Sequence, residues 1–214
     1  CRARFFSKLY SHNIAGMCGI VLCVDGLNCR QPEERGPDSS VSTRCLLERS
    51  DGCQVDYRLC FSRLQVFGQE GFGGDQPFLI NGISKSTIIS ATNGEIYNHK
   101  VIRENLTSFP YKTATNDCEA VMAACEAFMC GAPQRLRGQF AFMYAETDHR
   151  GLRRWMVARD GLGIAPLYYA IGTDGCLWVA SEMKAIAGAP GVEKVKLFPP
   201  GHVMSGDGAA MLPY

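Results

Sequence analysis

The sequence predicts an α+β protein in which antiparallel sheets pack in layers and helices lie outside them. Of its 214 residues, 46% are hydrophobic, which suits a globular domain and excludes a chain that is disordered throughout. Short apolar runs separated by turn signals recur and helical segments are few, which argues against a doubly wound parallel sheet. Residues 139–145 carry apolar side chains on both alternating faces, so this strand is expected to be covered on both sides.

The first half of the chain predicts strands separated by polar loops. Gly19–Val24 is a short β-branched run that ends at the turn signal Asp25-Gly26. A polar loop containing proline and glycine follows as far as Asp38. Further expected elements are strands at residues 57–66 and 87–91 and a short helix at residues 97–106.

The clearest helix is expected at residues 116–130. Asn116 can cap its first turn, and Glu119, three positions later, completes a capping-box pattern. Apolar residues recur at helical spacing on one face, and Gly131 is a typical C-terminal stop. The pattern therefore predicts an amphipathic helix with one face for packing.

The second half is rich in strands. After the strand at residues 139–145, neighbouring antiparallel strands are expected at residues 154–158, 166–171 and 177–180, followed by a short helix at residues 182–187. The crossovers between these segments are too short for parallel pairing.

Composition narrows the function classes. The formal net charge of +1 gives no reason to expect nucleic acid as a partner, and no run of about 18 apolar residues predicts a membrane-spanning helix. The 11 cysteines include no Cys-x-x-Cys pair, and the chain has four histidines, so we expect no metal site. We interpret most of the cysteines as reduced residues that fill apolar space, with one left as a potential nucleophile.

Residues 1–17 differ in composition from the rest. They hold Arg2, Arg4 and Lys8 but no acidic residue. Such a segment is typical of an organelle transit peptide, and equally of an untranslated leader or a short propeptide. We therefore expect the domain to span residues 18–214. The cytoplasm is favoured over an organelle, because transit-peptide cleavage directly before Cys18 would be a coincidence.

If Met17 is the start and is removed, Cys18 becomes the first residue. Its α-amine, with an ordinary pKa of about 7.7–8.0, could take the thiol proton at neutral pH and later return it to a leaving amine. One residue would then supply both nucleophile and base. A cysteine that opens a strand is more often structural, so Met17-Cys18-Gly19 alone leaves both interpretations open.

A series of short motifs in a fixed order is far more specific. Along the chain they are Met17-Cys18-Gly19-Ile20, Arg35-Gly36-Pro37-Asp38, Ser62-Arg63-Leu64, Asn93-Gly94-Glu95-Ile96-Tyr97-Asn98-His99, Asn116-Asp117-Cys118-Glu119, residues 158–168, Ser181-Glu182-Met183-Lys184-Ala185 and Phe198-Pro199-Pro200-Gly201-His202. The series closely resembles the class II glutamine amidotransferase domain of glutamine-hydrolysing asparagine synthetases, from residue 18 to about residue 204. The resemblance implies a four-layer α-β-β-α sandwich of two antiparallel sheets, of the N-terminal-nucleophile hydrolase type. It also implies hydrolysis of glutamine to glutamate and ammonia.

The resemblance assigns catalysis to three residues. Cys18 would attack the side-chain amide carbon of glutamine and form a glutamyl thioester. The tetrahedral oxyanion needs donors fixed in advance, which Asn93 would offer from its side-chain amide and Gly94 from its backbone N–H. From the residues alone, Asn93-Gly94 is also an ordinary hairpin-turn pair.

The resemblance also assigns the binding of glutamine's α-groups. Arg63 would hold the α-carboxylate through two parallel hydrogen bonds, while Asp117 and Glu95 would hold the α-ammonium. Without the resemblance, Arg63 is a surface residue at a strand edge, and Asp117 is an acid favoured by the helix dipole. The residues expected to order structure rather than catalyse are Arg35, Asp38, Arg159, Asp160 and His99.

The sequence departs from the family pattern in two places. The segment from Leu27 to Glu34 is too short for the helix that the family usually has there, so we expect one edge of the sheet to be less covered. No Ser-Gly-Gly-x-Asp-Ser loop of a synthetase domain occurs before Tyr214. We therefore expect either a fragment or a free-standing glutaminase.

The implied partners are glutamine and a C-terminal or separate synthetase domain that receives ammonia, and a homodimer is left open. No cofactor is expected in this domain, because ATP and Mg²⁺ belong to the synthetase domain. Two alternatives remain open. One is a catalytically silent regulatory or partner-binding module of the same fold, whose nucleophile is blocked by residues 1–17. The other is a glutaminase domain that serves a different amidotransferase.

Overall fold

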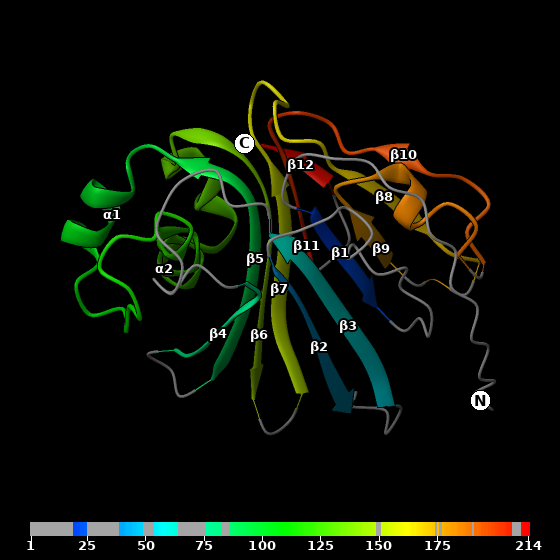
Figure 1. Cartoon of the computed structure of the whole chain (residues 1–214), viewed down its shortest axis with the longest axis horizontal. Coiled ribbons are helices and arrows are strands. Elements are labelled where there is room, and N and C mark those ends of the chain that lie inside the picture. The colour runs from blue at the N-terminus through cyan, green and yellow to red at the C-terminus, as the bar shows by residue number, and fades with distance from the viewer. Residues whose placement is uncertain are drawn as a thin grey trace.

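The computed structural model consists of two facing antiparallel sheets with helices outside them (Figure 1). It describes residues 19–24, 39–48, 54–63, 76–82, 86–148, 151–173, 175, 177–189, 191–206 and 211–214. The first sheet has the strand order β10-β8-β9-β1-β3-β2, and the second has the order β12-β11-β7-β6-β5-β4. Every strand pair in both sheets is antiparallel, as the sequence predicts.

The strands and helices have the following bounds. The first sheet contains β1 (Gly19–Val24), β2 (Ser39–Glu48), β3 (Gln54–Arg63), β8 (Tyr168–Ile171), β9 (Leu177–Ala180) and β10 (Lys196–Leu197). The second contains β4 (Phe78–Asn81), β5 (Thr87–Ile96), β6 (Gly138–Asp148), β7 (Gly151–Arg159), β11 (His202–Ser205) and β12 (Met211–Pro213). The helices are α1 (His99–Asn105) and α2 (Glu119–Phe128), with 3-10 turns η2 (Met129–Gly131), η3 (Pro133–Arg135) and η4 (Met183–Ala185).

Strand β6 shows how the layers are held together. Its even-numbered residues Phe140, Phe142 and Tyr144 pack into a core with α1 and α2. Its odd-numbered residues Ala141, Met143 and Ala145 pack into a second core between the two sheets. Because strand side chains alternate between faces, one strand serves both cores. The prediction that this strand is covered on both sides is confirmed.

The first sheet is covered on its outer face as well, but by less regular structure. In β9, Leu177 and Val179 face the core between the sheets. Trp178 and Ala180 face outward and pack against the end of η4 and the chain after it, through Ala185, Ile186, Ala189, Val192 and Val195. The two sheets are therefore sandwiched between α1 and α2 on one side and a 3-10 turn with irregular chain on the other (Figure 1).

The expected strands are present, but several differ in extent. β1 has the predicted bounds, whereas β2 and β4 were not predicted and β5 continues to Ile96 instead of ending at residue 91. β2 pairs with β3 along its whole length, from Ser39 opposite Arg63 to Glu48 opposite Gln54. Its serine-rich start resembles loop sequence, and the long-range ladder outweighs that local signal. The segment from Leu27 to Glu34 lies outside the described residues.

Helix α2 begins later than predicted, and the expected capping box is wrong. The helix starts at Glu119, and no side chain caps it. Asn116 Oδ1 instead accepts a hydrogen bond from Cys118 N at 2.9 Å, which makes a local turn before the helix. The helix ends at Phe128 because Met129 adopts a left-handed φ of 48°. No helix in the described part of the chain is long and apolar enough to cross a membrane.

Candidate active site

Asn93 lies near the end of β5 and faces the first sheet. It follows Ile89 and Ala91, which belong to the core between the sheets. Asn93 is 5% exposed, and its side-chain Nδ2 donates to Ser181 Oγ at 3.4 Å. Ser181 directly follows β9 of the first sheet. The Asn93 amide therefore spans the two sheets at one end of the sandwich.

Gly94 has a backbone geometry that an L-residue with a side chain does not tolerate. Its φ is +137°, and a Cβ there would overlap the carbonyl of Gln139 on β6. Gly138 mirrors it, since a Cβ there would overlap the carbonyl of Glu95. The ladder pairs Gly94 with Phe140 and Ile96 with Gly138. Asn93-Gly94 is thus part of a strand rather than a hairpin turn, and two glycines let the strand ends approach closely.

Asp117 is tied directly to this strand end. Its Oδ2 accepts a hydrogen bond from the backbone N–H of Ile96 at 2.7 Å. The next residue, Cys118, places its Sγ 3.7 Å from the carbonyl oxygen of Gly94. A carboxylate has about four acceptor positions, so Asp117 keeps capacity for a cationic ligand while bound to Ile96. The structure therefore brings Asn93, Gly94, Glu95 and Asp117 together.

The register of the first sheet places the start of β1 and the end of β3 side by side. Gly19, the first residue of β1, pairs with Ser62, and Arg63 is the last residue of β3. Val21 pairs with Ala180, so Ser181 follows beside the start of β1. The backbone of Arg63 and the start of β1 thus lie at the end of the first sheet from which Ser181 contacts Asn93. Cys18 precedes Gly19 in the chain and lies outside the described residues.

The loop that follows β7 supports the part of β6 that lies opposite Gly94. Asp160 accepts hydrogen bonds from the backbone N–H groups of Leu162, Ile164 and Ala165, and its own N–H donates to Phe140, the residue opposite Gly94. Arg159 donates to the carbonyls of Gly163, Ala165 and Phe198. These contacts confirm the prediction that Arg159 and Asp160 order a loop. Arg35 and Asp38 lie outside the described residues.

His99 opens helix α1 close to the site. Its Nδ1 is buried without a hydrogen-bond partner. Burial lowers the pKa of His99 below its ordinary value and outweighs the opposing charge of Asp117, while Arg103 and Lys100 lower the pKa further. A lowered pKa favours the neutral imidazole, in keeping with the predicted structural role.

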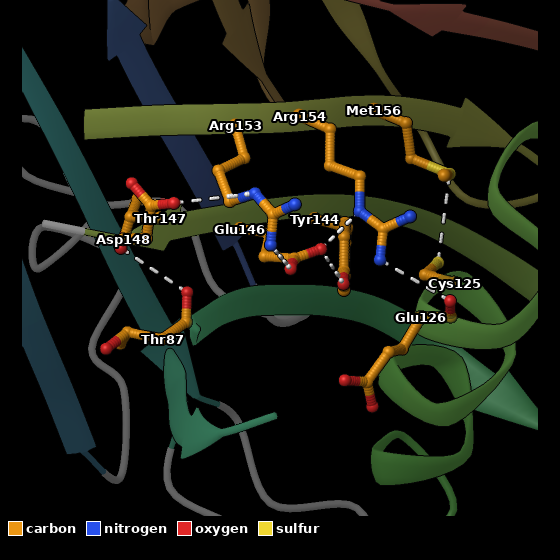
Figure 2. Close-up of polar contacts among 10 residues, drawn as sticks. All are labelled: Thr87, Cys125, Glu126, Tyr144, Glu146, Thr147, Asp148, Arg153, Arg154 and Met156. Atoms are coloured by element: carbon orange, nitrogen blue, oxygen red, sulfur yellow. Dashed lines mark hydrogen bonds and ion pairs between the residues drawn. The ribbon is translucent and has the colours of Figure 1, made fainter. Parts of the chain in front are cut away.

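A separate ionic cluster lies farther along β6 and β7 (Figure 2). Glu146 is fully buried and is bound by Arg154 Nε and, at 3.4 Å, by Arg153 Nη1. Burial is the main cause that raises the pKa of Tyr144 above its ordinary value, and the charge of Glu146, to which its hydroxyl donates, raises this pKa further. Glu146 is opposite Ile88, whereas Gly94 is opposite Phe140, so the strand separates the two groups by about 20 Å. This cluster is a structural anchor rather than part of the candidate site.

Of the cysteines whose side chains are described, two are buried as predicted and one, Cys130, is exposed. Cys118 and Cys125 are buried, and burial raises the pKa of the Cys125 thiol well above its ordinary value. Such a thiol stays protonated and acts as a small apolar group. Across the described residues, no three His, Cys, Asp or Glu side chains are grouped so as to hold a metal ion.

Sequence reasoning missed three residues that shape the site. They are Gly138, which lies against the backbone carbonyl of Glu95, Ser181, which accepts a hydrogen bond from Asn93, and Arg103, which binds the segment around Asp117. Ser181 was within a recognised motif, but its partner lies in the other sheet. Nothing in the sequence singled out Arg103 within the predicted helix at residues 97–106, and Glu119 was assigned to a cap that the structure does not form.

Comparison with solved structures supports the fold. The chain superimposes with a TM-score of 0.64 on the glutamine phosphoribosylpyrophosphate (PRPP) amidotransferase from B. subtilis complexed with ADP and GMP, covering 90% of this chain and 48% of that one at 15% identity. A structure described as the allosteric regulatory enzyme of purine biosynthesis gives a TM-score of 0.62 over the same shares at 16% identity. At these identities the likeness extends to the fold alone.

Comparison of sequences identifies the relatives. The chain is 37% identical over 201 residues to asparagine synthetase [glutamine-hydrolyzing] 3 of Arabidopsis thaliana, covering 88% of this chain and 31% of that protein. It is 36% identical over 176 residues to asparagine synthetase [glutamine-hydrolyzing] 2 of Oryza sativa subsp. japonica, covering 82% of this chain and 26% of that protein. The chain thus spans about a third or less of the length of these relatives.

The family model agrees with the motifs, the sheets and the relatives. The model described as a glutamine amidotransferase domain matches residues 61–188. That range includes Asn93, Gly94 and Asp117, the residues that the structure gathers at the end of β5. The chain therefore belongs to the glutamine amidotransferase domain family.

Proposed function

We propose that this domain hydrolyses the side-chain amide of glutamine, with Cys18 as an N-terminal nucleophile. The observation that carries the proposal is the meeting of Asn93, Gly94 and Asp117 at one strand end in a chain of this family. The start of β1, which follows Cys18 in the chain, lies at the end of the first sheet where Ser181 contacts Asn93.

The first half of the reaction forms a covalent intermediate. The α-amine of Cys18 takes the thiol proton, and the thiolate attacks the amide carbon of glutamine. The resulting oxyanion accepts hydrogen bonds from the Asn93 side chain and the Gly94 backbone N–H. When the carbon–nitrogen bond breaks, the α-ammonium returns its proton to the leaving nitrogen, and ammonia departs from a glutamyl thioester.

The second half regenerates the enzyme. Water attacks the thioester carbonyl, the α-amine of Cys18 takes a proton from that water, and the same donors bind the new oxyanion. Collapse breaks the carbon–sulfur bond and releases glutamate, and the α-ammonium of Cys18 returns its proton to the leaving thiolate, which restores the thiol. These two reaction steps use no metal or cofactor in the domain.

The α-groups of glutamine hold the substrate in place. Arg63, at the end of β3, binds the α-carboxylate through its guanidinium fork. Asp117 and Glu95 bind the α-ammonium. Asp117 is supported by its bond to Ile96, which orients the carboxylate beside Glu95.

The ammonia is proposed to pass to a synthetase domain, attached or separate, that forms asparagine with ATP and Mg²⁺. The proposal rests on the similarity to glutamine-hydrolysing asparagine synthetases. We place the reaction in the cytoplasm, and a homodimer remains open.

The test compares two forms of the protein. One is the chain as given, and the other is processed so that Cys18 is its first residue. The processed form should release glutamate from glutamine and be inactivated by a glutamine-analogue electrophile that labels Cys18, while the extended form should be at least about a hundredfold slower because its Cys18 nitrogen is an amide. Equal activity of the two forms, or unchanged activity in Cys18→Ala, would overturn the mechanism. Absence of glutaminase activity in a folded processed form would favour a silent module.

A further inference from the structure

Arg103, near the end of helix α1, binds the loop that leads into α2. Its Nη1 donates to the carbonyl of Thr113 at 2.8 Å, and its Nη2 donates to the carbonyl of Asn116. The guanidinium also lies over the ring of Tyr111, 4.3 Å from the ring centroid. The side chain is only 14% exposed. One side chain thus contacts the loop at three points.

Glu119 binds both Arg103 and the same loop. It lies in the first turn of α2 with a fully buried side chain, and its Oε2 forms an ion pair with Arg103 Nη2 at 3.1 Å. The same oxygen accepts a hydrogen bond from Thr113 N at 3.2 Å. A buried carboxylate is costly unless it is paired, so Glu119 holds Arg103 in place as much as Arg103 holds Glu119.

Asp117 lies between the two points that Arg103 holds. The carbonyl of Asn116 precedes it, and Glu119 follows it by two residues. The hydrogen bond from Cys118 N to Asn116 Oδ1 tightens the same turn. The path of the chain through Asp117, and with it the meeting of its carboxylate with Ile96 N, is thus held by a guanidinium that binds the chain on either side of Asp117.

We propose that Arg103 is a positioning residue that sets the carboxylate of Asp117 for the α-ammonium of the substrate. The inference rests on the proposed function, in which Asp117 binds that group. A planar guanidinium has donors fixed in several directions and can serve two carbonyls and a carboxylate at once. Lysine keeps the charge but is a single point donor, so it loses that geometry. Arg103 therefore contributes to selectivity for α-amino substrates without contacting them.

The experiment measures selectivity rather than activity alone. Glutaminase kinetics are compared for glutamine and for its analogue in which hydrogen replaces the α-amino group, with the analogue used as a substrate or as a competitive inhibitor. The variants are Arg103→Lys, Glu119→Gln, Asp117→Asn and the double variant Arg103→Lys/Asp117→Asn. Arg135→Lys is the matched control, because Arg135 is exposed and lies over Phe128 outside this loop.

Arg103→Lys and Asp117→Asn should each lower the preference for glutamine over the analogue by about tenfold or more, mainly through the KM for glutamine. Glu119→Gln should shift it in the same direction by about threefold, because a neutral partner holds the guanidinium less firmly. The double variant should be no less selective than Asp117→Asn alone, since both changes act on one contact. Arg135→Lys should keep the wild-type preference.

Two results separate this inference from the proposed function. If Asp117→Asn loses selectivity but Arg103→Lys keeps it and loses only thermal stability, Arg103 is merely structural and the inference fails alone. If Asp117→Asn itself keeps the wild-type preference, the assignment of the ammonium site fails and the inference fails with it. If Arg103→Lys does not fold, Glu119→Gln decides, and wild-type selectivity in that variant overturns the inference.

Discussion

The carboxylate of Asp117 accepts a 2.7 Å hydrogen bond from the backbone N–H of Ile96. This bond joins the start of α2 to the end of β5, two elements that the chain separates by a helix and a loop. It lies two residues from Gly94, so the segment proposed to bind the substrate ammonium and the segment proposed to stabilise the oxyanion are held as one unit. A substitution that shifts the backbone of either segment is therefore expected to displace the other segment as well.

Gly94→Ala should abolish activity and destabilise the protein. A methyl group at this position overlaps the Gln139 carbonyl, and the φ of +137° is strained for alanine. We expect a loss of about 3 kcal/mol in the free energy of unfolding, measured by chemical denaturation, together with loss of glutamate release. Gly161→Ala is the control: no atom lies within 4 Å of its added Cβ, so its stability should stay within about 0.5 kcal/mol of wild type. A stable, active Gly94→Ala would contradict the geometry.

Asn93→Ala should lower kcat far more than it raises KM. The proposed role of the amide is to donate to the oxyanion, a charge that exists only after attack on the substrate. We expect kcat to fall by about 10²–10³ with KM within about threefold of wild type, measured by initial-rate kinetics of glutamate release. Ser181→Ala, which removes the acceptor at 3.4 Å, should give a smaller loss with the same pattern. An effect confined to KM would speak against Asn93 as an oxyanion donor.

Arg154→Ala should destabilise the fold without altering the site. Glu146 is fully buried, and Arg154 is its close partner, so removing Arg154 leaves a buried carboxylate poorly compensated (Figure 2). We expect a cost of about 3 kcal/mol in the free energy of unfolding and an unchanged KM for glutamine. The side chain of Arg153 is 48% exposed, so Arg153→Ala should lower the free energy of unfolding by less than about 1 kcal/mol. Equal costs for the two variants would show that Arg154 is not the main counter-charge.

Because the pKa of His99 is lowered in the folded protein, the free energy of unfolding should depend on pH. Its pKa in the folded protein is lowered by burial, so between that value and its ordinary value of 6.5 the unfolded chain binds more protons than the folded one. Stability should therefore fall as the pH drops below about 6.5 and level off once the folded imidazole is also protonated. His99→Gln should flatten this part of the profile, measured by urea denaturation from pH 5 to pH 8. An identical profile in the variant would show that His99 titrates normally.

Sequence patterns predicted the fold where local and long-range forces agree. The bounds of β1 and the two covered faces of β6 follow directly from apolar runs and alternation. β2 was missed because its stability comes from a ten-residue ladder with β3, a pairing that no local propensity reveals. The start of α2 was misplaced because Asn116 accepts from Cys118 N in a turn before the helix, while Glu119 pairs with the partly buried Arg103 instead of completing a cap.

The candidate site shows the same division. Asn93, Gly94 and Asp117 were recognised through the order of motifs, and the structure places them together. Gly138 was missed because its close neighbour is a backbone carbonyl, and Arg103 because two of its partners are backbone carbonyls and its carboxylate partner, Glu119, lies 16 residues away, none of which leaves a local signature in the sequence. Residues that hold others in place are therefore harder to find from sequence than residues that bear reactive groups.

The apolar layer between the two sheets has a further consequence. Asn93 is opposite Ala141 in the ladder, and Ala91 precedes it on the same face, so the filling next to the site is made of single methyl groups. Farther along the same faces of β5 and β6, Ile89 and Met143 supply bulkier side chains. Next to Asn93 the second sheet thus contributes only methyl groups to the space between the sheets, and a larger side chain at Ala91 or Ala141 would press on the first sheet without touching any reacting atom.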